Sequence, residues 1–154
     1  MADVKVRPRV LNLKEEIAKG GFTPINVALS GAKPVQIGEG EHTSAVDTGT
    51  DDLPGYNVKF LVDDPRSKHL IEIVEVDPGM RKYRHHHNNA ETVLVFLEGE
   101  GEFYVDDKTA IPVKAGDFAH SLPGETHGVG NTGNVPIRYL VVEGPMPLDM
   151  HRED

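Results

Sequence analysis

The sequence predicts a single all-β domain, built as a sandwich or a barrel of short strands. Its 154 residues include 16 glycines and 11 prolines. Short apolar runs such as 58–62 and 92–97 lie between these turn-forming residues, a pattern typical of strands joined by tight turns. A chain of this length is expected to form one domain that removes about 70% of its unfolded surface from water.

The N-terminal part predicts an arm with one short helix and edge strands. Asn12 is placed to cap a helix over 14–19, which a pair of glycines would end. The candidate strands 23–30 and 32–37 each contain a proline, which suits the edge of a sheet. The polar stretch 38–56 predicts a surface loop that is long enough to act as a lid. We expect at most one or two short helices in the whole chain.

From residue 58 onward, strands and turns alternate without helices between them, as in a sandwich or barrel. Strand 92–97 is apolar on both faces, so both faces must be covered. One face would line the interior, and the other would pack on the N-terminal arm or on a second subunit. We therefore expect a homodimer in which residues 1–37 pack against the neighbouring barrel. The expected strands are 58–62, 69–76, 80–87, 92–97, 102–106, 110–113, 118–122, 126–129 and 137–142.

Charge and composition argue against several classes of partner. The formal net charge is -9 at pH 7, and the acidic residues are scattered, so a nucleic-acid backbone would be repelled. We expect no membrane partner, because no run approaches the roughly 20 apolar residues of a membrane helix and the N-terminus lacks a signal-peptide pattern. Cysteine is absent. Its absence fits a reducing, cytoplasmic location and leaves histidine and carboxylate as the available metal ligands.

Residues 85–91 (His-His-His-Asn-Asn-Ala-Glu) contain three of the eight histidines and a carboxylate. Alternation along a strand would put His85 and His87 on one face and His86 on the other. Such a concentration of imidazoles predicts a metal site. One alternative is an incidental, exposed histidine run. A second, the remnant of a purification tag, does not fit a position in the middle of a chain.

Glu91 completes the candidate ligand set. A turn at 88–89 would bring its carboxylate back toward the histidine pair. Two nitrogens and one oxygen with open coordination positions suit Fe(II), Mn(II), Ni(II) or Zn(II). The alternative is an ion pair of Glu91 with Arg84 or Lys82.

Two motifs occur in order along the chain, the first with Gly, His-x-His, Glu and Gly, and the second with Gly, Pro-Gly, His and Asn. In their order and separation they resemble the two motifs of the cupin superfamily, which are small β-barrels of jelly-roll topology. Seven residues separate Glu91 from Gly99, where the family pattern has six, and Pro123 lies one place later than usual. Both departures fall at turns. The motif residues are Gly79, His85, His87, Glu91 and Gly99, followed by Gly116, Pro123, Gly124, His127 and Asn131.

The resemblance covers roughly residues 58–142 and implies a single jelly-roll barrel. An N-terminal arm, 1–57, would precede this barrel and a C-terminal tail, 143–154, would follow it. The resemblance also implies one divalent transition metal per chain, with two coordination positions open to water, substrate or dioxygen. The implied metal ligands are His85, His87, Glu91 and His127.

Other residues are candidates for catalysis and substrate binding. Tyr83 and Arg81 would share the face of the histidine pair, as a proton donor and as a partner for a substrate carboxylate. Packing and surface exposure are the alternatives for both. His120 is a candidate general acid or base if it faces inward. Val93 and Val95 would line an apolar pocket.

We therefore expect a metal-dependent enzyme that acts on a small organic substrate chelating the metal through two oxygens. A dioxygenase using Fe(II) is slightly favoured, and the expected apolar pocket wall slightly favours an aromatic or other apolar substrate over a sugar. One alternative is a non-redox enzyme, namely an isomerase, epimerase, lyase or decarboxylase. Another is a metal-containing protein that binds a small ligand without turnover. The ligand set alone does not select among them.

Overall fold

The computed structural model describes residues 8–28, 53–146 and 148–154. Short antiparallel strands account for most of the regular structure, and two short helices, α1 (Leu13–Lys19) and α2 (Ile25–Ala28), lie near the N-terminus. The predicted all-β class is confirmed. The strands are β1 (Thr23–Pro24), β2 (Tyr56–Phe60), β3 (Leu70–Val76), β4 (His85–His86), β5 (Glu91–Glu98), β6 (Glu100–Tyr104), β7 (Ala110–Lys114), β8 (Phe118–Ser121), β9 (Val129–Gly130), β10 (Ile137–Gly144) and β11 (His151–Arg152).

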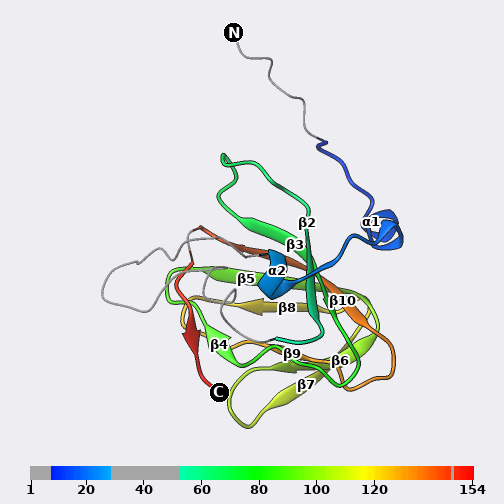
Figure 1. Cartoon of the computed structure of the whole chain (residues 1–154). Coiled ribbons are helices and arrows are strands. Elements are labelled where there is room, and N and C mark those ends of the chain that lie inside the picture. Colours follow the sequence, from blue (N-terminus) through cyan, green and yellow to red (C-terminus); the bar gives the residue numbers. More distant parts are fainter. Residues whose placement is uncertain (1–7, 29–52, 147) are drawn as a thin grey trace.

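The strands form a jelly-roll barrel of two main sheets. The larger sheet has the strand order β1-β2-β3-β10-β5-β8, and the smaller sheet has the order β7-β6-β9. Figure 1 shows the larger sheet lying over the smaller one. Strand β10 is central because it pairs with β3 on one side and with β5 on the other. Side chains on its inner face therefore project into the middle of the barrel.

The core occupies the space between the sheets. On β5 the inward positions are Thr92, Leu94 and Phe96, each at most 3% exposed. The Phe96 ring packs against Tyr139 of β10, with the ring centroids 5.4 Å apart. The sequence pattern predicted that the odd-numbered residues of this strand, including Val93 and Val95, face inward. Its apolar residues continue on both faces, so periodicity could not select the inner one, and that expectation was wrong.

The N-terminal helix α1 has the expected cap and ending. The Asn12 side chain accepts a hydrogen bond from the Glu15 backbone N–H at 3.0 Å, and Gly20 follows the helix with a φ of 68°. Lys59 of β2 anchors the helix through an ion pair of 2.9 Å with Glu16. Of the helices in the described ranges, neither has the length and apolar character needed to cross a bilayer.

The predicted strand 23–30 is only partly correct. Residues Thr23–Pro24 pair with β2 as strand β1, but Ile25–Ala28 form the single-turn helix α2. Pro24 directly precedes this turn, a place where a missing backbone N–H costs little. The predicted strand 32–37, and all but the last few residues of the predicted loop 38–56, lie outside the described residues.

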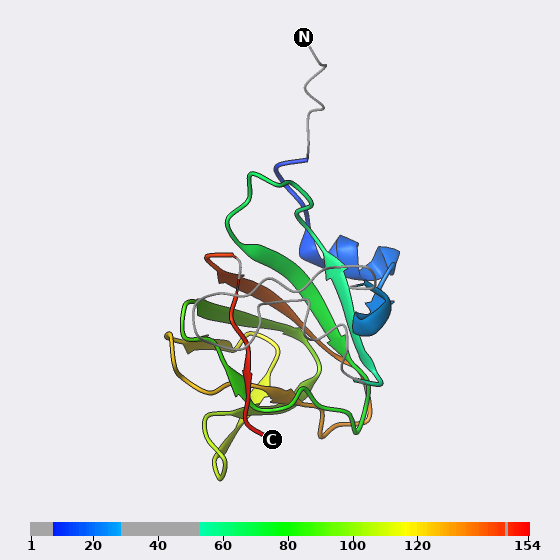
Figure 2. The same ribbon diagram turned by 60° about the vertical axis from the view of Figure 1, so that its left-hand side comes forward.

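The last seven residues are part of the barrel rather than a free tail. Strand β11 pairs with β4, with His151 opposite His86 and Arg152 opposite His85. Figure 2 shows this C-terminal strand lying alongside β4. Leu148 and Met150, just before β11, are 1% and 7% exposed. The segment 148–154 thus covers an edge of the strand that carries the histidine run.

Candidate metal centre

Four buried side chains meet inside the barrel and could together hold a metal ion. His85, His87, His127 and Glu143 each offer one ligand atom, and these atoms all lie within 4.8 Å of one another. None of the four residues is more than 8% exposed. The structure brings together the three histidines expected as ligands. Its carboxylate, however, comes from the stretch that the sequence analysis assigned to a tail.

Strand pairing positions the three imidazoles. His85 and His87 point the same way, because alternate residues of an extended strand share a face. The backbones of His85 and His127 exchange two hydrogen bonds, of 3.1 and 2.8 Å, which place the third imidazole beside the pair. Glu143 lies near the end of β10 on its buried face.

Backbone carbonyls fix the tautomers of two histidines. The His85 Nδ1 lies 2.9 Å from the Tyr83 carbonyl oxygen, and the His87 Nδ1 lies 2.5 Å from the Asp149 carbonyl oxygen. A carbonyl oxygen only accepts, so each Nδ1 carries the proton and donates it. Each Nε2 is then left with a lone pair for a metal, the arrangement by which outer-shell groups usually orient ligating histidines.

The electrostatics of the cluster favour metal-binding protonation states. Burial, reinforced by the nearby His127, holds the pKa of His85 well below its usual value. Burial likewise lowers the pKa of His127, and the opposing effect of Glu143 is smaller. Burial alone would raise the pKa of Glu143, but His87 and His127 outweigh it and keep this pKa well below its usual value. Neutral imidazoles and an ionised carboxylate are the forms that bind metals.

His87 is the exception, because it shares its proton balance with Glu143. Burial lowers the pKa of His87, but the Glu143 carboxylate outweighs burial, and the net shift is upward. The His87 Nε2 lies 2.9 Å from Glu143 Oε1, and the His127 Nε2 lies 3.5 Å from the same oxygen. A metal entering the cluster would therefore compete with a proton on His87.

The donor atoms are close together, yet several of them lack a properly oriented hydrogen bond. Within the described part of the chain, the buried His87 Nε2 and both ring nitrogens of His127 have no partner in hydrogen-bond geometry. Buried nitrogens without partners are costly unless another species satisfies them. A divalent cation in the cluster would satisfy the Nε2 atoms of His87 and His127, and three imidazoles with one carboxylate suit Mn, Fe, Co, Ni or Zn. The residues present therefore fit a mononuclear metal site.

Glu91, the predicted carboxylate ligand, does not reach this cluster. It is the first residue of β5, its side chain is 53% exposed, and it hydrogen-bonds His120 on the outer face of the sheet. Thr92, one residue later, faces inward and lies opposite Glu143 in the β5–β10 register. Its hydroxyl donates a 2.9 Å hydrogen bond to the Glu143 carboxylate. The structure corrects the fourth ligand from Glu91 to Glu143.

The distance to Gly99 contained the signal for this correction. Gly99 turns the chain after β5 with a φ of 80°, and a Cβ there would lie 2.5 Å from a backbone carbonyl oxygen, so this glycine is structurally required. Counting back the family spacing of six residues from Gly99 leads to Thr92 rather than Glu91. The inward position thus holds a threonine, and the carboxylate comes from the adjacent strand. No motif marks Glu143, although alternation along β10 places it on the buried face.

The two residues expected to be catalytic lie outside the cluster. His120 is on the outer face of β8, where it pairs with Glu91. Tyr83 is 2% exposed and packs edge-on against His85, with ring centroids 5.5 Å apart. Its backbone carbonyl orients His85, but its side chain does not line the pocket beside the cluster. These placements argue against direct catalytic roles for both side chains.

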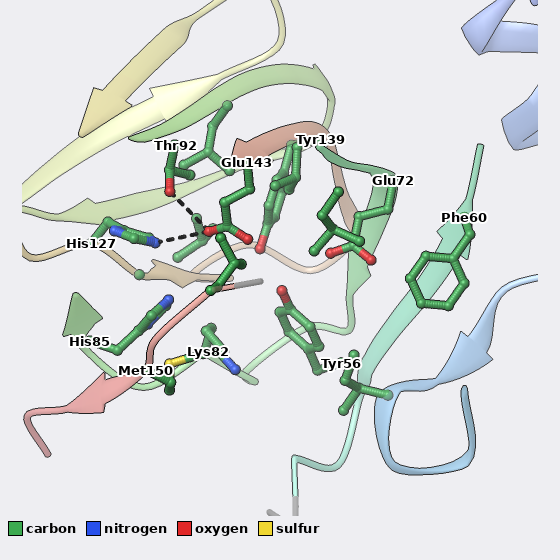
Figure 3. Close-up of a pocket in the computed structure, with 17 residues that line it drawn as sticks. Tyr56, Phe60, Glu72, Lys82, His85, Thr92, His127, Tyr139, Glu143 and Met150 are labelled. Atoms are coloured by element: carbon green, nitrogen blue, oxygen red, sulfur yellow. Dashed lines mark hydrogen bonds and ion pairs between the residues drawn. The ribbon is translucent and has the colours of Figure 1, made fainter. Parts of the chain in front are cut away.

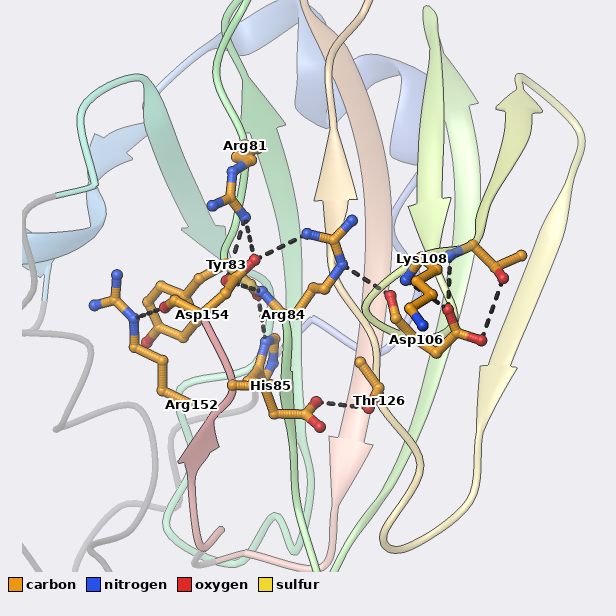
Figure 4. Close-up of polar contacts among 11 residues, drawn as sticks. Arg81, Tyr83, Arg84, His85, Asp106, Lys108, Thr126, Arg152 and Asp154 are labelled. Atoms are coloured by element: carbon orange, nitrogen blue, oxygen red, sulfur yellow. Dashed lines mark hydrogen bonds and ion pairs between the residues drawn. The ribbon is translucent and has the colours of Figure 1, made fainter.

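The residues expected to bind substrate also face away from the pocket. Arg81 makes an ion pair of 3.1 Å with Asp154 on the barrel surface, which Figure 4 shows together with neighbouring Arg84. Val93 and Val95 are half-buried on the face of β5 opposite to Thr92 and Leu94. Arg81 and the two valines are therefore corrected from pocket to surface or outer-face positions.

A small pocket opens beside the cluster, with a cavity volume of about 60 Å³. His85, His127 and Glu143 form part of its wall, and apolar side chains such as Leu94 and Met150 form much of the rest. Figure 3 shows four further polar side chains around the same space. These side chains are Tyr56, Glu72, Lys82 and Tyr139, and of the four only Tyr139 was expected as one that could line the barrel.

The position of Lys82 shows why Arg81 was wrongly expected at the pocket. Both Lys82 and Tyr83 are buried, so strict alternation fails in the residues just before β4. The Lys82 Nζ lies 4.0 Å from the centroid of the Tyr83 ring and 5.3 Å from that of Tyr56. A cation held over aromatic rings at a pocket wall would attract an anionic ligand.

The C-terminal segment supports the cluster from behind. Besides the carbonyl that orients His87, Asp149 uses its carboxylate to accept hydrogen bonds from the backbone N–H groups of Asn88 and Asn89, at 3.1 and 3.0 Å. The Asn89 side chain in turn accepts from the Asp149 N–H at 3.0 Å. At the far end, Asp154 pairs with Arg84 at 2.9 Å (Figure 4). This segment therefore fixes both the turn after His87 and the strand before it.

Comparisons with known proteins agree with this architecture. A family model described as a cupin domain matches residues 72–143. An oxalate-binding protein of Thermotoga maritima is 35% identical over 73 residues, a stretch that covers 47% of this chain and 60% of that protein. The match thus spans less than two thirds of that relative.

Solved structures extend the likeness to the whole fold. A double-stranded β-helix protein of Klebsiella pneumoniae is 19% identical with a TM-score of 0.62, over 96% of this chain and 100% of that one. A sugar phosphate isomerase of the cupin superfamily from Silicibacter pomeroyi is 26% identical with a TM-score of 0.61, over 66% of this chain and 68% of that one. The matching family model, the jelly-roll barrel and its internal three-histidine cluster together support placing the chain in the cupin superfamily.

Proposed function

We propose that the protein binds one divalent transition metal and is a metal-dependent enzyme for a small, oxygen-rich organic acid or sugar acid. The observation that carries this proposal is the buried cluster of His85, His87, His127 and Glu143 in the wall of a pocket. Four protein ligands on an octahedral ion leave two positions for a chelating substrate. Once bound, the ion would act as a Lewis acid that polarises the substrate oxygens.

The protein's own groups would bind and orient the substrate. Lys82, whose ammonium lies at the pocket wall, would attract a substrate carboxylate or phosphate. Apolar side chains including Leu94, Val141 and Leu148 would exclude water around it. The Thr92 hydroxyl holds the Glu143 carboxylate in place.

The pocket composition favours non-redox chemistry over a dioxygenase. The expected preference for an apolar substrate depended on a wall formed by Val93 and Val95, and those residues face away from the pocket. Ionisable groups, Lys82 and Glu72, line it instead. Such groups suit an isomerase, epimerase, lyase or decarboxylase, which moves protons rather than electrons. The 26% identity to a sugar phosphate isomerase supports the same direction.

Ligand binding without turnover is the second candidate. The 35% identity to an oxalate-binding protein over 73 residues favours it. Oxalate also has two oxygens that can chelate one ion. Under this alternative, the metal-loaded protein would bind oxalate tightly and convert neither oxalate nor any related acid.

The experiment begins with protein purified without a histidine tag. Metal-free protein is loaded in turn with Mn(II), Fe(II), Co(II), Ni(II) and Zn(II), and metal content is measured after gel filtration. We expect about one ion per chain for at least one metal. Calorimetry with oxalate and NMR assays with 2-oxo acids, 2-hydroxy acids and sugar phosphates then separate binding from turnover. An oxygen electrode tests whether the Fe(II)-loaded protein consumes oxygen with any of these compounds. Failure of every metal to bind stoichiometrically would exclude the proposal.

We further propose that the protein is a homodimer. Apolar side chains remain exposed in the N-terminal part, including Val10 at 89% and Val27 at 56%. A second copy packing there would cover them. Light scattering of the metal-loaded protein should give twice the 16.9 kDa chain mass, and a monomer would contradict the prediction.

A further inference from the structure

Glu72 is a buried carboxyl group in an otherwise apolar row of the inner sheet face. It lies on β3, opposite Phe60 of β2 and Val141 of β10. Only 5% of the residue is exposed, and it lines the pocket next to the metal cluster. Figure 3 shows its carboxyl group on the pocket wall, on the side away from His85 and His127.

This carboxyl group does not help to hold the barrel together. Within the described ranges, its Oε2 is buried and has no hydrogen-bond partner. A leucine or methionine would fill a similar volume without leaving a polar atom unsatisfied. A buried group that costs stability, and that faces a pocket, is a candidate for function.

The surroundings of Glu72 keep it protonated near neutral pH. Burial raises its pKa to about 8, the negative charge of Glu143 adds to this effect, and Lys82 opposes it. Tyr56 and Tyr139 share the pocket and hydrogen-bond each other, and burial raises the pKa of both hydroxyls above their ordinary value. The two tyrosines therefore cannot act as bases near neutrality, whereas Glu72 can both give and take a proton there.

The strand register places Glu72 within reach of a substrate at the cluster. Val141, opposite Glu72, and Glu143 are both on the inner face of β10, two residues apart. Glu72 and Glu143 are thus diagonal neighbours across the β3–β10 pair, with backbones about 7–8 Å apart. A small molecule that chelates a metal beside Glu143 would extend along this face and meet the Glu72 carboxyl group.

We propose that Glu72 is the catalytic acid and base for a substrate held at the metal cluster, and that the reaction is a proton transfer at a carbon next to a carbonyl or carboxylate. This inference rests on the proposed metal-dependent function and narrows it to the proton-transfer branch. Glu72 and Glu143 then have separate roles, because Glu143 binds the metal and Glu72 contacts the substrate.

The step needs no oxidant or reductant. Ionised Glu72 takes the proton from the substrate carbon, so the C–H bond breaks and an O–H bond forms on Glu72. The electron pair of the broken bond moves onto the adjacent carbonyl oxygen of the substrate. The reverse transfer breaks the Glu72 O–H bond and forms a C–H bond, either at the same carbon or at its neighbour. Exchange with solvent protons is expected while the proton is on Glu72.

Hydrogen–deuterium exchange tests this step without knowledge of the natural substrate. Zn(II)-loaded protein, which is redox-inert, is incubated in D2O with pyruvate, malate and fructose 6-phosphate, and NMR follows loss of the carbon-bound proton. We expect exchange with at least one probe, with a rate that rises with pH and levels off at or below about pH 8, since the metal charge favours the Glu72 carboxylate.

Three variants make the test specific to Glu72. Glu72→Gln should lower the exchange rate by about 100-fold or more, the usual scale of general acid–base catalysis, while retaining one Zn(II) per chain. Glu72→Asp should recover part of the rate and keep its rise with pH. Glu75→Gln is the matched control, because Glu75 is on the same strand but forms an ion pair with Arg138 outside the pocket. It should exchange at the wild-type rate.

The outcomes separate the two proposals. Stoichiometric metal with no exchange of any probe, or with a wild-type rate in Glu72→Gln, would overturn the role of Glu72 and leave the metal site standing. If the wild-type protein binds no metal, the proposed function itself is overturned. Thermal unfolding provides an independent check, because Glu72→Gln should be at least as stable as wild type if the carboxyl group is kept for function.

Discussion

Two histidine–glutamate groups lie on opposite faces of the larger sheet, and only the inner one has the properties of a metal site. Inside the barrel, Glu143 meets His87 and His127, and all three side chains are at most 10% exposed. On the outer face, Glu91 meets His120, with side chains 53% and 36% exposed. A histidine–glutamate contact thus occurs on each face of the sheet, in a buried environment on the inner face and in an exposed one on the outer face.

The difference between the two groups arises from strand parity. Glu91 and Thr92 are consecutive, so their side chains leave β5 on opposite faces. Thr92 lies opposite Glu143 and contacts its carboxylate inside the barrel. A single position along the strand therefore decides whether a carboxylate faces a low-dielectric cluster or solvent. Only in the first place can it hold a desolvated cation strongly.

Neutralising each carboxylate in turn tests whether only the inner one binds the metal. Glu143→Gln removes a ligand, and we expect a loss of metal affinity greater than the 10–100-fold that changes in outer-shell partners typically cause. Glu91→Gln should change the affinity by less than about twofold, since solvent screens an exposed charge outside the barrel. Competition against a chromogenic chelator measures both dissociation constants. Equal losses in the two variants would show that the cluster has been assigned to the wrong face.

Glu72 is buried like Glu143, but among the described residues no histidine contributes to its pKa shift. Burial raises its pKa from 4.5 to about 8 in the folded protein. Below the unfolded value the group is neutral in both states. Between the two values unfolding releases a proton, so stability falls as the pH rises and levels off above about 8. At about 1.4 kcal/mol per pKa unit, the total loss is about 3 to 5 kcal/mol.

Urea unfolding of the metal-free protein at pH 5 and pH 9 measures this effect. Glu72→Gln should be less destabilised than wild type by the change to pH 9, because glutamine does not titrate. Parallel pH profiles for the two proteins would mean that Glu72 is already ionised in the folded state.

The sequence predicted the parts of the site that depend on local periodicity. His85 and His87 follow from alternation within one strand, and His127 follows from its place in the second motif. The capped helix α1 depends on Asn12 and on the glycines that follow it, which are also local signals. Such features need no knowledge of which strands are neighbours.

The parts that the sequence did not predict depend on strand pairing. Glu143 joins the site only because β10 pairs with β5 in one particular register. The inward position of Lys82 depends on a break in alternation before β4. Strand β11 forms only by pairing with the edge of β4, which the folded barrel provides. Strand 92–97 was apolar on both faces, so its pattern could not show that Leu94 rather than Val93 faces the core.

The inner group also differs from the outer one because Asp149 holds the backbone that follows His87. The Asp149 carboxylate accepts hydrogen bonds from two consecutive backbone N–H groups, of Asn88 and Asn89, and its carbonyl orients His87. Asp149→Ala keeps the carbonyl but removes the carboxylate that holds the backbone of Asn88 and Asn89, so the carbonyl should lose its alignment on His87 and metal binding should weaken by about 10-fold, the lower end of the effect of disturbing an outer-shell partner. Asp154→Asn is the matched control in the same segment, because it breaks ion pairs with Arg81 and Arg84 but none near His87. A similar loss of affinity in both variants would indicate general loosening of the segment rather than orientation of His87.

The smallest expected effect concerns the outer pair itself. Replacing His120 by glutamine removes its contact with Glu91 on an exposed face of the sheet. Exposed pairs of this kind contribute about 0–1 kcal/mol, so the free energy of unfolding at pH 6 should change by no more than about that amount. Metal content and the rate of proton exchange should match wild type, because the side chain lies across the sheet from the cluster. A large loss of exchange activity in His120→Gln, with metal retained, would show that the outer face takes part in the chemistry and would restore His120 as a general acid or base.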